Sequence, residues 1–526
     1  MPRLRPLPVL VAIGAFALIV RVACLPAVSE SNLTPDGARF LNIARCITRG
    51  QGFSTPEAWP AWMAPERLPM PETFKEPGYP FAIAALAGLG VPLFAAGQWI
   101  SLLAGLLLPF IVYALGRRLH ADPWVALAAA ALTAACPVLI AQSAYVMAES
   151  LFALLVTTAF LAAAPRLAGE GLEAGRAFAP PPTAQALDFA AGAIFGLAFL
   201  VRAHALLAAP ALLLLLVAGA RPRVRVARVL LAGVGALAAV APFLARNVRL
   251  FGAPLHSDVT AFGLWPYVDT FALVHSPDRP PDATRYALAH LGDVMRVVVH
   301  GARRFAIETL PHDLLGHWVF LVPLALGAAI AAARARVWGF ASVFLVTTLA
   351  FILGLNWIAR YFASLAPVLS LLVALGAVSL ARSWSSSESA RGVRPSRVPG
   401  LVFALLLAAV AVRSVRHVAT PPDRERDAAR NEAAFLDAHL TRDEAVMGET
   451  TSYWAYYADR FAVYPLVADS ARFADTVRRL HVRWAALPTS RLAEFASRYP
   501  GGRLPAALHI DHADPARDVT VFAVAP

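Results

Sequence analysis

The chain has 526 residues, of which 58% are hydrophobic, and its mean hydropathy is +0.60. Apolar runs of about 20 residues, the length that crosses a bilayer core, recur along most of it, so an ordinary soluble protein is excluded and a polytopic α-helical membrane protein is indicated. The formal net charge of +12 does not indicate nucleic-acid binding, because most arginines lie in short loops between apolar runs and no basic patch is interleaved with aromatic residues.

The first predicted element is a membrane span over about residues 7–27. Arg3 and Arg5 precede it and place the N-terminus in the cytoplasm, so the span ends on the outer side. The basic and then apolar start resembles a signal peptide, but its apolar stretch is long and the residues before Cys24 form a poor cleavage context. We therefore expect an uncleaved first span.

The first outer loop, about residues 28–78, carries two side chains of special interest. One is Asp36, in TPDGARFLNIARCITRGQGF, and the other is Lys75, in FKEPGYP, which is the only lysine in the chain. The apolar stretch that follows at 79–93 is interrupted by glycine and proline and is short for a crossing. We expect it to form a helix at the outer interface.

The remaining apolar runs alternate across the membrane, and every arginine-dense short loop falls on the cytoplasmic side. Together with the first span they give eleven crossings besides the interfacial helix, and a long outer loop is predicted at about 246–315. The later spans are expected, in chain order, at about 96–115, 123–141, 149–165, a pair within 188–219, 226–244, 317–333, 337–355, 362–380 and 399–415.

From residue 418 the composition changes to charged segments without an apolar run. Strand-like pieces (VMGET, RFAVYPLV, RWAALP, DVTVFAVA) alternate with helix-like ones (NEAAFLDAHL, DSARFADTVRRL, SRLAEFASRY). This alternation predicts a small α/β domain on the outer face over 418–526, after a transmembrane domain over 1–417. No internal repeat is apparent, which counts against transporter folds built from inverted halves.

Polar residues of the later spans also gather on the outer side in this topology. Glu149 begins one span and Arg202 ends another. Ionisable residues at membrane depth are costly and are usually paired or functional. Two carboxylates and several cations at one interface suit a general base that faces an anionic, phosphate-bearing lipid. The other polar residues at outer helix ends are Arg246, Asn247, Arg360 and Tyr361.

Each of these residues also has a purely structural interpretation. Asp36 could cap the helix that GARFLNIARCI predicts, and Glu149 could cap or snorkel at its helix end. The arginines could anchor helix ends at headgroup level, and Trp265 could be an interfacial aromatic residue. The structural interpretation must then explain why all of them share one face.

Six polar or glycine-containing elements follow one another along the chain: PDGARFLNIARCITRGQGF, KEPGYP, CPVLIAQSAYVMAESLF, GAIFGLAFLVR, ARNVRLFG and ARYFASLAPVL. As an ordered set, over about residues 7–380, they resemble the GT-C membrane glycosyltransferases that use polyprenyl-phosphate sugars. That group includes the protein O-mannosyltransferases, the lipid A aminoarabinose transferases and the bacterial family related to both.

The resemblance implies a glycosyltransferase of a bacterial inner membrane, with its active site and C-terminal domain outside the cytoplasm. Asp36 would be the catalytic base that activates the acceptor, and Glu149 would be the second acidic residue. Displacement of the lipid phosphate from the anomeric carbon implies inversion. The residues implied to bind the donor phosphate are Lys75, Arg202, Arg246, Arg360 and Tyr361, and those implied to line the substrate pocket are Tyr79, Asn247 and Trp265.

We expect no cofactor, because cations can neutralise the phosphate and no Asp-x-Asp pair lies near Asp36 to hold a metal ion, although a divalent metal stays open. The three cysteines form no CxxC or Cys/His cluster and predict neither a zinc site nor a disulfide framework. The chain departs from the family at Gly37, where many relatives carry Glu, and at Phe40, where Tyr is frequent.

The expected partners are a polyprenyl-phosphate sugar donor, an acceptor that could be a lipid, a glycan or a protein, and the bilayer. Two other functions stay open. A flippase or transporter of lipid-linked sugars predicts ionisable residues deep within spans and repeat symmetry. A non-catalytic membrane scaffold would act through its outer C-terminal domain.

Overall fold

The structure, a computed structural model, divides into two compact units. We call the first, residues 1–27, 98–256 and 295–419, the helical unit, and the second, residues 28–97, 257–294 and 420–526, the mixed unit. The structure describes residues 6–59, 61–63, 65–164, 182–218, 222–259, 267, 283–355, 358–390, 398–418, 423–441, 443–464 and 470–525.

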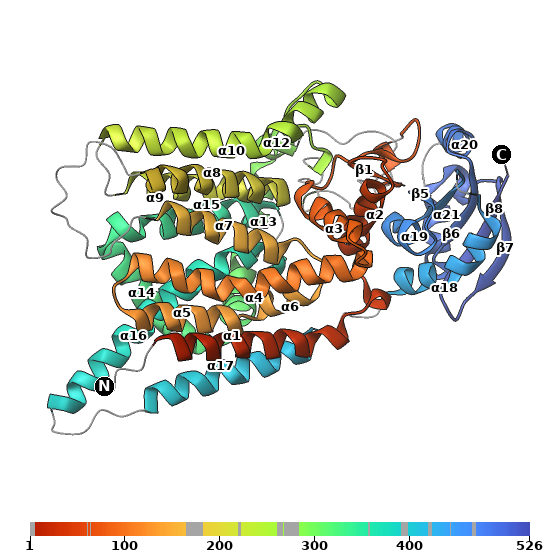
Figure 1. Cartoon of the computed structure of the whole chain (residues 1–526). Helices are drawn as coiled ribbons and strands as arrows, with labels where there is room; N and C mark the ends of the chain where they lie inside the picture. Colours follow the sequence, from red (N-terminus) through yellow and green to blue (C-terminus); the bar gives the residue numbers. More distant parts are fainter. Residues whose placement is uncertain are drawn as a thin grey trace. The chain divides into compact units, whose positions relative to one another are not determined.

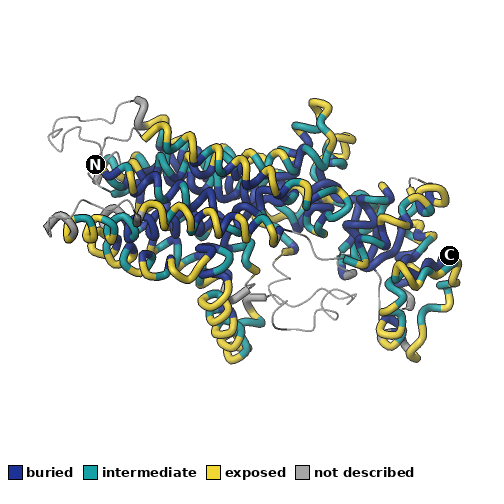
Figure 2. The backbone as a smooth tube through the Cα atoms, turned by 90° about the horizontal axis from the view of Figure 1, so that it is seen from below, coloured by how far each residue is buried: buried dark blue, intermediate teal, exposed yellow. Residues whose placement is uncertain are grey.

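The helical unit is a bundle of long apolar helices, several of which run side by side (Figure 1). Buried residues fill its interior and exposed residues line its outer turns (Figure 2). The helices wholly or mostly within it are α1 (Pro6–Cys24), α4 (Leu93–Leu119), α5 (Pro123–Ala135), α6 (Pro137–Ala144), α7 (Glu149–Ala163), α8 (Pro182–Val201), α9 (Ala209–Val217), α10 (Pro222–Phe251), α13 (Leu291–Arg304), α14 (Leu321–Ala333), α15 (Ala335–Leu355), α16 (Ala366–Ala390) and α17 (Val398–His417).

Four helical stretches in the described part of the chain are long and apolar enough to cross a membrane, or six if each of two bent pairs counts as one span. Their outer faces carry large exposed apolar side chains, such as Leu230 and Val234 of α10, which are 63% and 58% exposed. Such a surface suits lipid rather than water. The structure thus supports an apolar helical membrane protein, and the count of eleven crossings stays a prediction.

One predicted span differs in the structure. The run at 123–141 is split into α5 and α6, which are bent by 53°. Pro137 lacks a backbone N–H and disfavours helical geometry in the residue before it. Cys136 accordingly has an extended backbone, with ψ of 121°.

Glycines allow α8 and α10 to approach closely. A Cβ atom on Gly192 would lie 1.7 Å from the carbonyl oxygen of Ala232, and one on Gly196 would lie 2.7 Å from that of Ala236. On the facing helix, a Cβ on Gly235 would lie 2.1 Å from the carbonyl oxygen of Phe189. The glycines of GAIFGLAFLVR therefore serve helix packing, as small residues do in membrane bundles.

The mixed unit contains a six-stranded sheet in the order β2-β5-β4-β6-β8-β7. Strands β2, β5, β4 and β6 are parallel, and β8 is antiparallel to both β6 and β7. The strands are β2 (Glu57–Ala58), β4 (Ala445–Gly448), β5 (Phe461–Val463), β6 (Val482–Leu487), β7 (Leu508–Asp514) and β8 (Val519–Val524), and a separate pair joins β1 (Ser54–Thr55) to β3 (Met70–Pro71).

The helices of the mixed unit come from all three of its segments. Helix α3 coincides with most of the short apolar run that was predicted to be an interfacial helix, whose place at the interface stays a prediction. The helices are α2 (Pro35–Thr48), α3 (Gly78–Gly88), α12 (Ala283–Ala289), α18 (Arg424–His439), α19 (Thr451–Tyr457), α20 (Ser470–Arg479) and α21 (Leu492–Arg498).

The first outer loop and the C-terminal segment form one sheet, which differs from the predicted division at residue 418. Strand β2 joins the edge of the C-terminal sheet at β5. Glu57 of this strand is fully buried, and its carboxylate accepts hydrogen bonds from the hydroxyls of Thr451 (2.9 Å) and Ser452 (2.5 Å). A two-residue strand that pairs across about 400 residues leaves no periodic signal in the sequence.

Candidate functional site

Asp36 and Lys75 form an ion pair in the mixed unit. The Nζ atom of Lys75 lies 2.6 Å from Oδ1 of Asp36, and the two side chains are 20% and 25% exposed. The ammonium group also lies 5.4 Å from the ring centroid of Phe40. The pair is thus held in place and still reached by solvent.

Asp36 is not the cap of its helix. Thr34 is the N-cap of α2, and its hydroxyl accepts a hydrogen bond of 3.1 Å from the backbone N–H of Gly37. Pro35 occupies the first turn, where its missing N–H costs nothing. Asp36 lies in the same turn, where the helix dipole favours a negative charge. The capping interpretation is therefore wrong for this residue.

Tyr79 supports the aromatic side chain beside this pair. It is fully buried, its hydroxyl donates a 2.8 Å hydrogen bond to the carbonyl of Gly97, and its ring packs edge-on against Phe40 at 5.0 Å. Its place in a substrate pocket stays a prediction.

A second cluster in the helical unit joins four of the predicted residues. Glu149, the first residue of α7, has a buried carboxylate whose Oε1 pairs with Arg202 and lies 3.9 Å from Nε of Arg360. Both guanidinium groups lie over the ring of Tyr361, at 5.5 and 5.2 Å from its centroid. In the described part of the chain, no donor reaches the other carboxylate oxygen, Oε2. That oxygen is itself buried, so a role of Glu149 toward a substrate stays a prediction.

The backbone explains how Arg202 reaches this cluster. Helix α8 ends at Val201, and Arg202 itself is extended, with φ of −154° and ψ of 122°. It thereby leaves the helix before the 3₁₀ turn Ala203–Ala208 begins. Its side chain is about one-tenth exposed, so the cluster is largely desolvated.

The contacts of Arg246 and Asn247 organise the end of α10. Arg246 Nη1 donates to Asn247 Oδ1 (2.9 Å), and Asn247 Nδ2 donates to the carbonyl of Pro254 (3.1 Å). Asn247 is buried and so fixes the turn that follows the helix. Their predicted roles toward substrate stay predictions. Trp265 lies outside the described residues.

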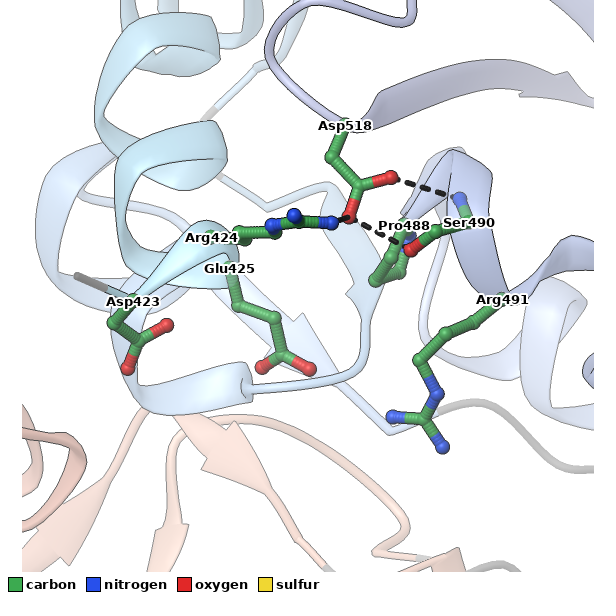
Figure 3. A pocket seen from close by; sticks show the side chains of 7 residues that line it. All are labelled: Asp423, Arg424, Glu425, Pro488, Ser490, Arg491 and Asp518. Carbon is green, nitrogen blue, oxygen red and sulfur yellow. Dashed lines mark hydrogen bonds and ion pairs between the residues drawn. The ribbon is translucent and has the colours of Figure 1, made fainter.

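The mixed unit also has a charged pocket of about 410 Å³ that the sequence did not suggest. Asp518 accepts hydrogen bonds of 2.8 Å from both the N–H and the hydroxyl of Ser490 (Figure 3). Burial, with the nearby Asp423 carboxylate, raises the pKa of Glu425 to about 7 against a smaller opposing effect of Arg491. The pocket is lined by Asp423, Arg424, Glu425, Pro488, Ser490, Arg491 and Asp518.

The raised pKa of Glu425 predicts a pH-dependent stability. Below pH 4.5 the carboxyl is protonated in both the folded and the unfolded state. Between pH 4.5 and about 7 it ionises mainly in the unfolded state, so the free energy of unfolding falls as the pH rises, and the loss is complete above about pH 7. Replacing Glu425 with Gln should therefore stabilise the protein by about 1–3 kcal/mol at pH 8 and have no effect near pH 4.5. Thermal unfolding at both pH values tests this, with Glu66→Gln, at an exposed carboxylate outside the pocket, as control. An equal effect at both pH values would contradict it.

No group of three or more His, Cys, Asp or Glu side chains is placed to hold a metal ion within the described ranges. The three cysteines are buried and unbridged.

Comparisons with known proteins give the site a family context. The model of the family described as dolichyl-phosphate-mannose-protein mannosyltransferase matches residues 75–245. That range begins at Lys75 and includes Glu149 and Arg202, and it covers less than half of the chain. No curated protein matches this chain.

Solved structures show the fold. One is the oligosaccharyltransferase AglB from Archaeoglobus fulgidus, in complex with an inhibitory peptide and a dolichol-phosphate. It is 16% identical to this chain, and the match has a TM-score of 0.59 and covers 99% of this chain and 74% of AglB. ArnT from Cupriavidus metallidurans is 14% identical in the apo state (TM-score 0.59) and 15% identical when bound to undecaprenyl phosphate (0.56), each over 98% of this chain and 97% of its own. The predicted resemblance to GT-C membrane glycosyltransferases is confirmed.

Proposed function

We propose that this chain is a glycosyltransferase that moves a sugar from a polyprenyl-phosphate donor to an acceptor at the outer face of a bacterial inner membrane. The observation that carries the proposal is the Asp36–Lys75 ion pair, which sets a partly exposed carboxylate 2.6 Å from a cation. A base and a phosphate-binding cation are the two groups that this reaction needs side by side.

The proposed reaction is a single displacement at the anomeric carbon. A hydroxyl or similar nucleophile of the acceptor gives its proton to Asp36 and forms a bond to that carbon. The bond from the carbon to the phosphate oxygen breaks, and the polyprenyl phosphate leaves with the electron pair. Attack opposite the leaving group inverts the configuration.

Cations would stabilise the leaving phosphate. In the mixed unit, Lys75 offers up to three N–H donors to the phosphate. Phosphate binding by Arg202 and Arg360 of the helical unit stays a separate prediction, which suits their guanidinium groups because each can meet two phosphate oxygens at once. The polyprenyl phosphates present with AglB and ArnT support this class of donor. No metal ion is needed in this scheme, because the positive charge of these side chains opposes the charge that develops on the phosphate.

Replacing Lys75 with Met should weaken binding of the lipid phosphate. Loss of a charge-assisted hydrogen bond costs about 1.5–3 kcal/mol, which raises the Kd for undecaprenyl phosphate about 10- to 100-fold. The measurement is binding of undecaprenyl phosphate to the full chain in nanodiscs. Lys75→Arg, which keeps the charge, is the matched variant and should retain most of the affinity. Equal affinity of Lys75→Met and wild type for the lipid would contradict a role of Lys75 in binding the phosphate.

A further inference from the structure

A buried glutamate, Glu72, organises the segment that presents Lys75. Its Oε1 atom accepts three successive backbone N–H groups, those of Thr73 (3.1 Å), Phe74 (2.5 Å) and Lys75 (3.0 Å). Carbonyl or carboxylate oxygens that gather successive N–H groups fix the local backbone. The carboxylate therefore determines where the Lys75 side chain starts.

The same carboxylate also binds Arg39 of helix α2. Arg39 donates to Glu72 through Nη2, at 3.1 Å to each oxygen, and through Nε, at 3.3 Å to Oε2. Arg39 lies three residues after Asp36, which is about one helical turn. Glu72 thus connects the helix that carries Asp36 to the segment that carries Lys75.

Further contacts hold residues 73 and 74 of the same segment. The carbonyl of Thr73 accepts the N–H of Asp258 (3.1 Å) and the hydroxyl of Ser257 (3.3 Å). The Arg39 guanidinium lies over the ring of Phe74, at 4.9 Å from its centroid. The backbone of Thr73 is thus held by residues 257–258, whereas the side chains of Glu72, Phe74 and Lys75 contact α2.

Stability alone does not explain a charged pair at this place. Glu72 is 1% exposed and Arg39 is 3% exposed. Apolar residues of similar volume often replace such a buried pair without loss of stability, because desolvating two charges offsets much of their attraction. A function that needs precise placement does explain it.

We propose that Glu72 is a positioning residue that sets the distance between Asp36 and Lys75. The consequence for sugar transfer rests on the function proposed above, whereas the backbone arrangement does not. Two variants separate the charge of Glu72 from its position in the hydrogen-bonded segment. Glu72→Gln keeps an acceptor oxygen but loses the charge, and the double variant Arg39→Met/Glu72→Met removes both buried charges together.

The first arm of the test needs no substrate. Hydrogen exchange of the amides of residues 73–75, followed by mass spectrometry of the full chain in nanodiscs, should speed up at least tenfold in the double variant and severalfold in Glu72→Gln. The matched control is Glu449→Gln, at a buried carboxylate of the mixed unit that pairs with Arg491, which should leave these amides unchanged. Unchanged exchange in the double variant, with its unfolding temperature preserved, would overturn the proposal.

The second arm measures binding of undecaprenyl phosphate. The double variant should keep its unfolding temperature within a few degrees yet bind this lipid at least tenfold more weakly, and Glu449→Gln should bind it normally. A residue that merely neutralised Arg39 would give normal binding in the double variant, which would also overturn the proposal. If the wild type does not bind the lipid at all, the proposed function fails, and hydrogen exchange alone decides the role of Glu72.

Discussion

Replacing Asp36 with Asn is expected to reduce sugar transfer by about 10²- to 10⁴-fold, the usual contribution of a general base. The amide has nearly the same shape, but it cannot take the proton of the acceptor. The fold should survive, because Thr34 rather than Asp36 caps α2. The measurement is release of polyprenyl phosphate from a labelled donor by the full chain in nanodiscs.

The neighbouring cap residue provides the control. Thr34→Ala removes the capping hydroxyl and should cost about 1 kcal/mol of stability, while the Asp36 carboxylate remains. This variant should unfold at a lower temperature and still transfer sugar. Near-normal sugar transfer by Asp36→Asn would show that Asp36 is not the general base.

Replacing Arg202 with Leu is expected to destabilise the helical unit by about 3–5 kcal/mol, as loss of one partner from a buried ion pair does. Glu149 has a 3% exposed side chain, and its remaining cation, Arg360, lies 3.9 Å away. The carboxylate would be left largely uncompensated. Thermal unfolding of the full chain in detergent measures the effect.

The double variant Glu149→Leu/Arg202→Leu separates folding from function at this cluster. It removes both charges and should regain most of the lost stability, while sugar transfer stays low because the second acidic residue is gone. A purely structural cluster would regain transfer along with stability. An unfolding temperature of Arg202→Leu equal to that of the wild type would contradict the prediction.

The ordered motifs selected polar residues near helix ends as one group, but they did not predict which of these residues pair. Asp36 meets Lys75, and Glu149 meets Arg202 and Arg360, although each partner is distant in sequence. The Thr-Pro pair before Asp36 is a typical helix start and could have identified Thr34 as the cap from the sequence. Hydropathy indicated the long apolar helices, whereas it could not separate short helices from spans.

Other features depend on tertiary contacts that no local pattern reports. The strand β2 has only two residues, and it pairs with β5 where the carboxylate of Glu57 bonds to two hydroxyls of α19. Glu72 lies in a proline-rich loop without periodicity, and only its contacts with Arg39 and the following backbone reveal its importance. The charged pocket around Glu425 combines segments that are distant in sequence.

The most direct test of the proposed function is mass spectrometry of envelope glycans and lipids from cells that lack this protein, complemented with wild type or with Asp36→Asn. We predict that a sugar-bearing species disappears on deletion, returns with the wild type and does not return with Asp36→Asn, while the polyprenyl-phosphate sugar accumulates. Identical glycans and lipids in all of these cells, with both proteins expressed, would contradict a glycosyltransferase that uses Asp36.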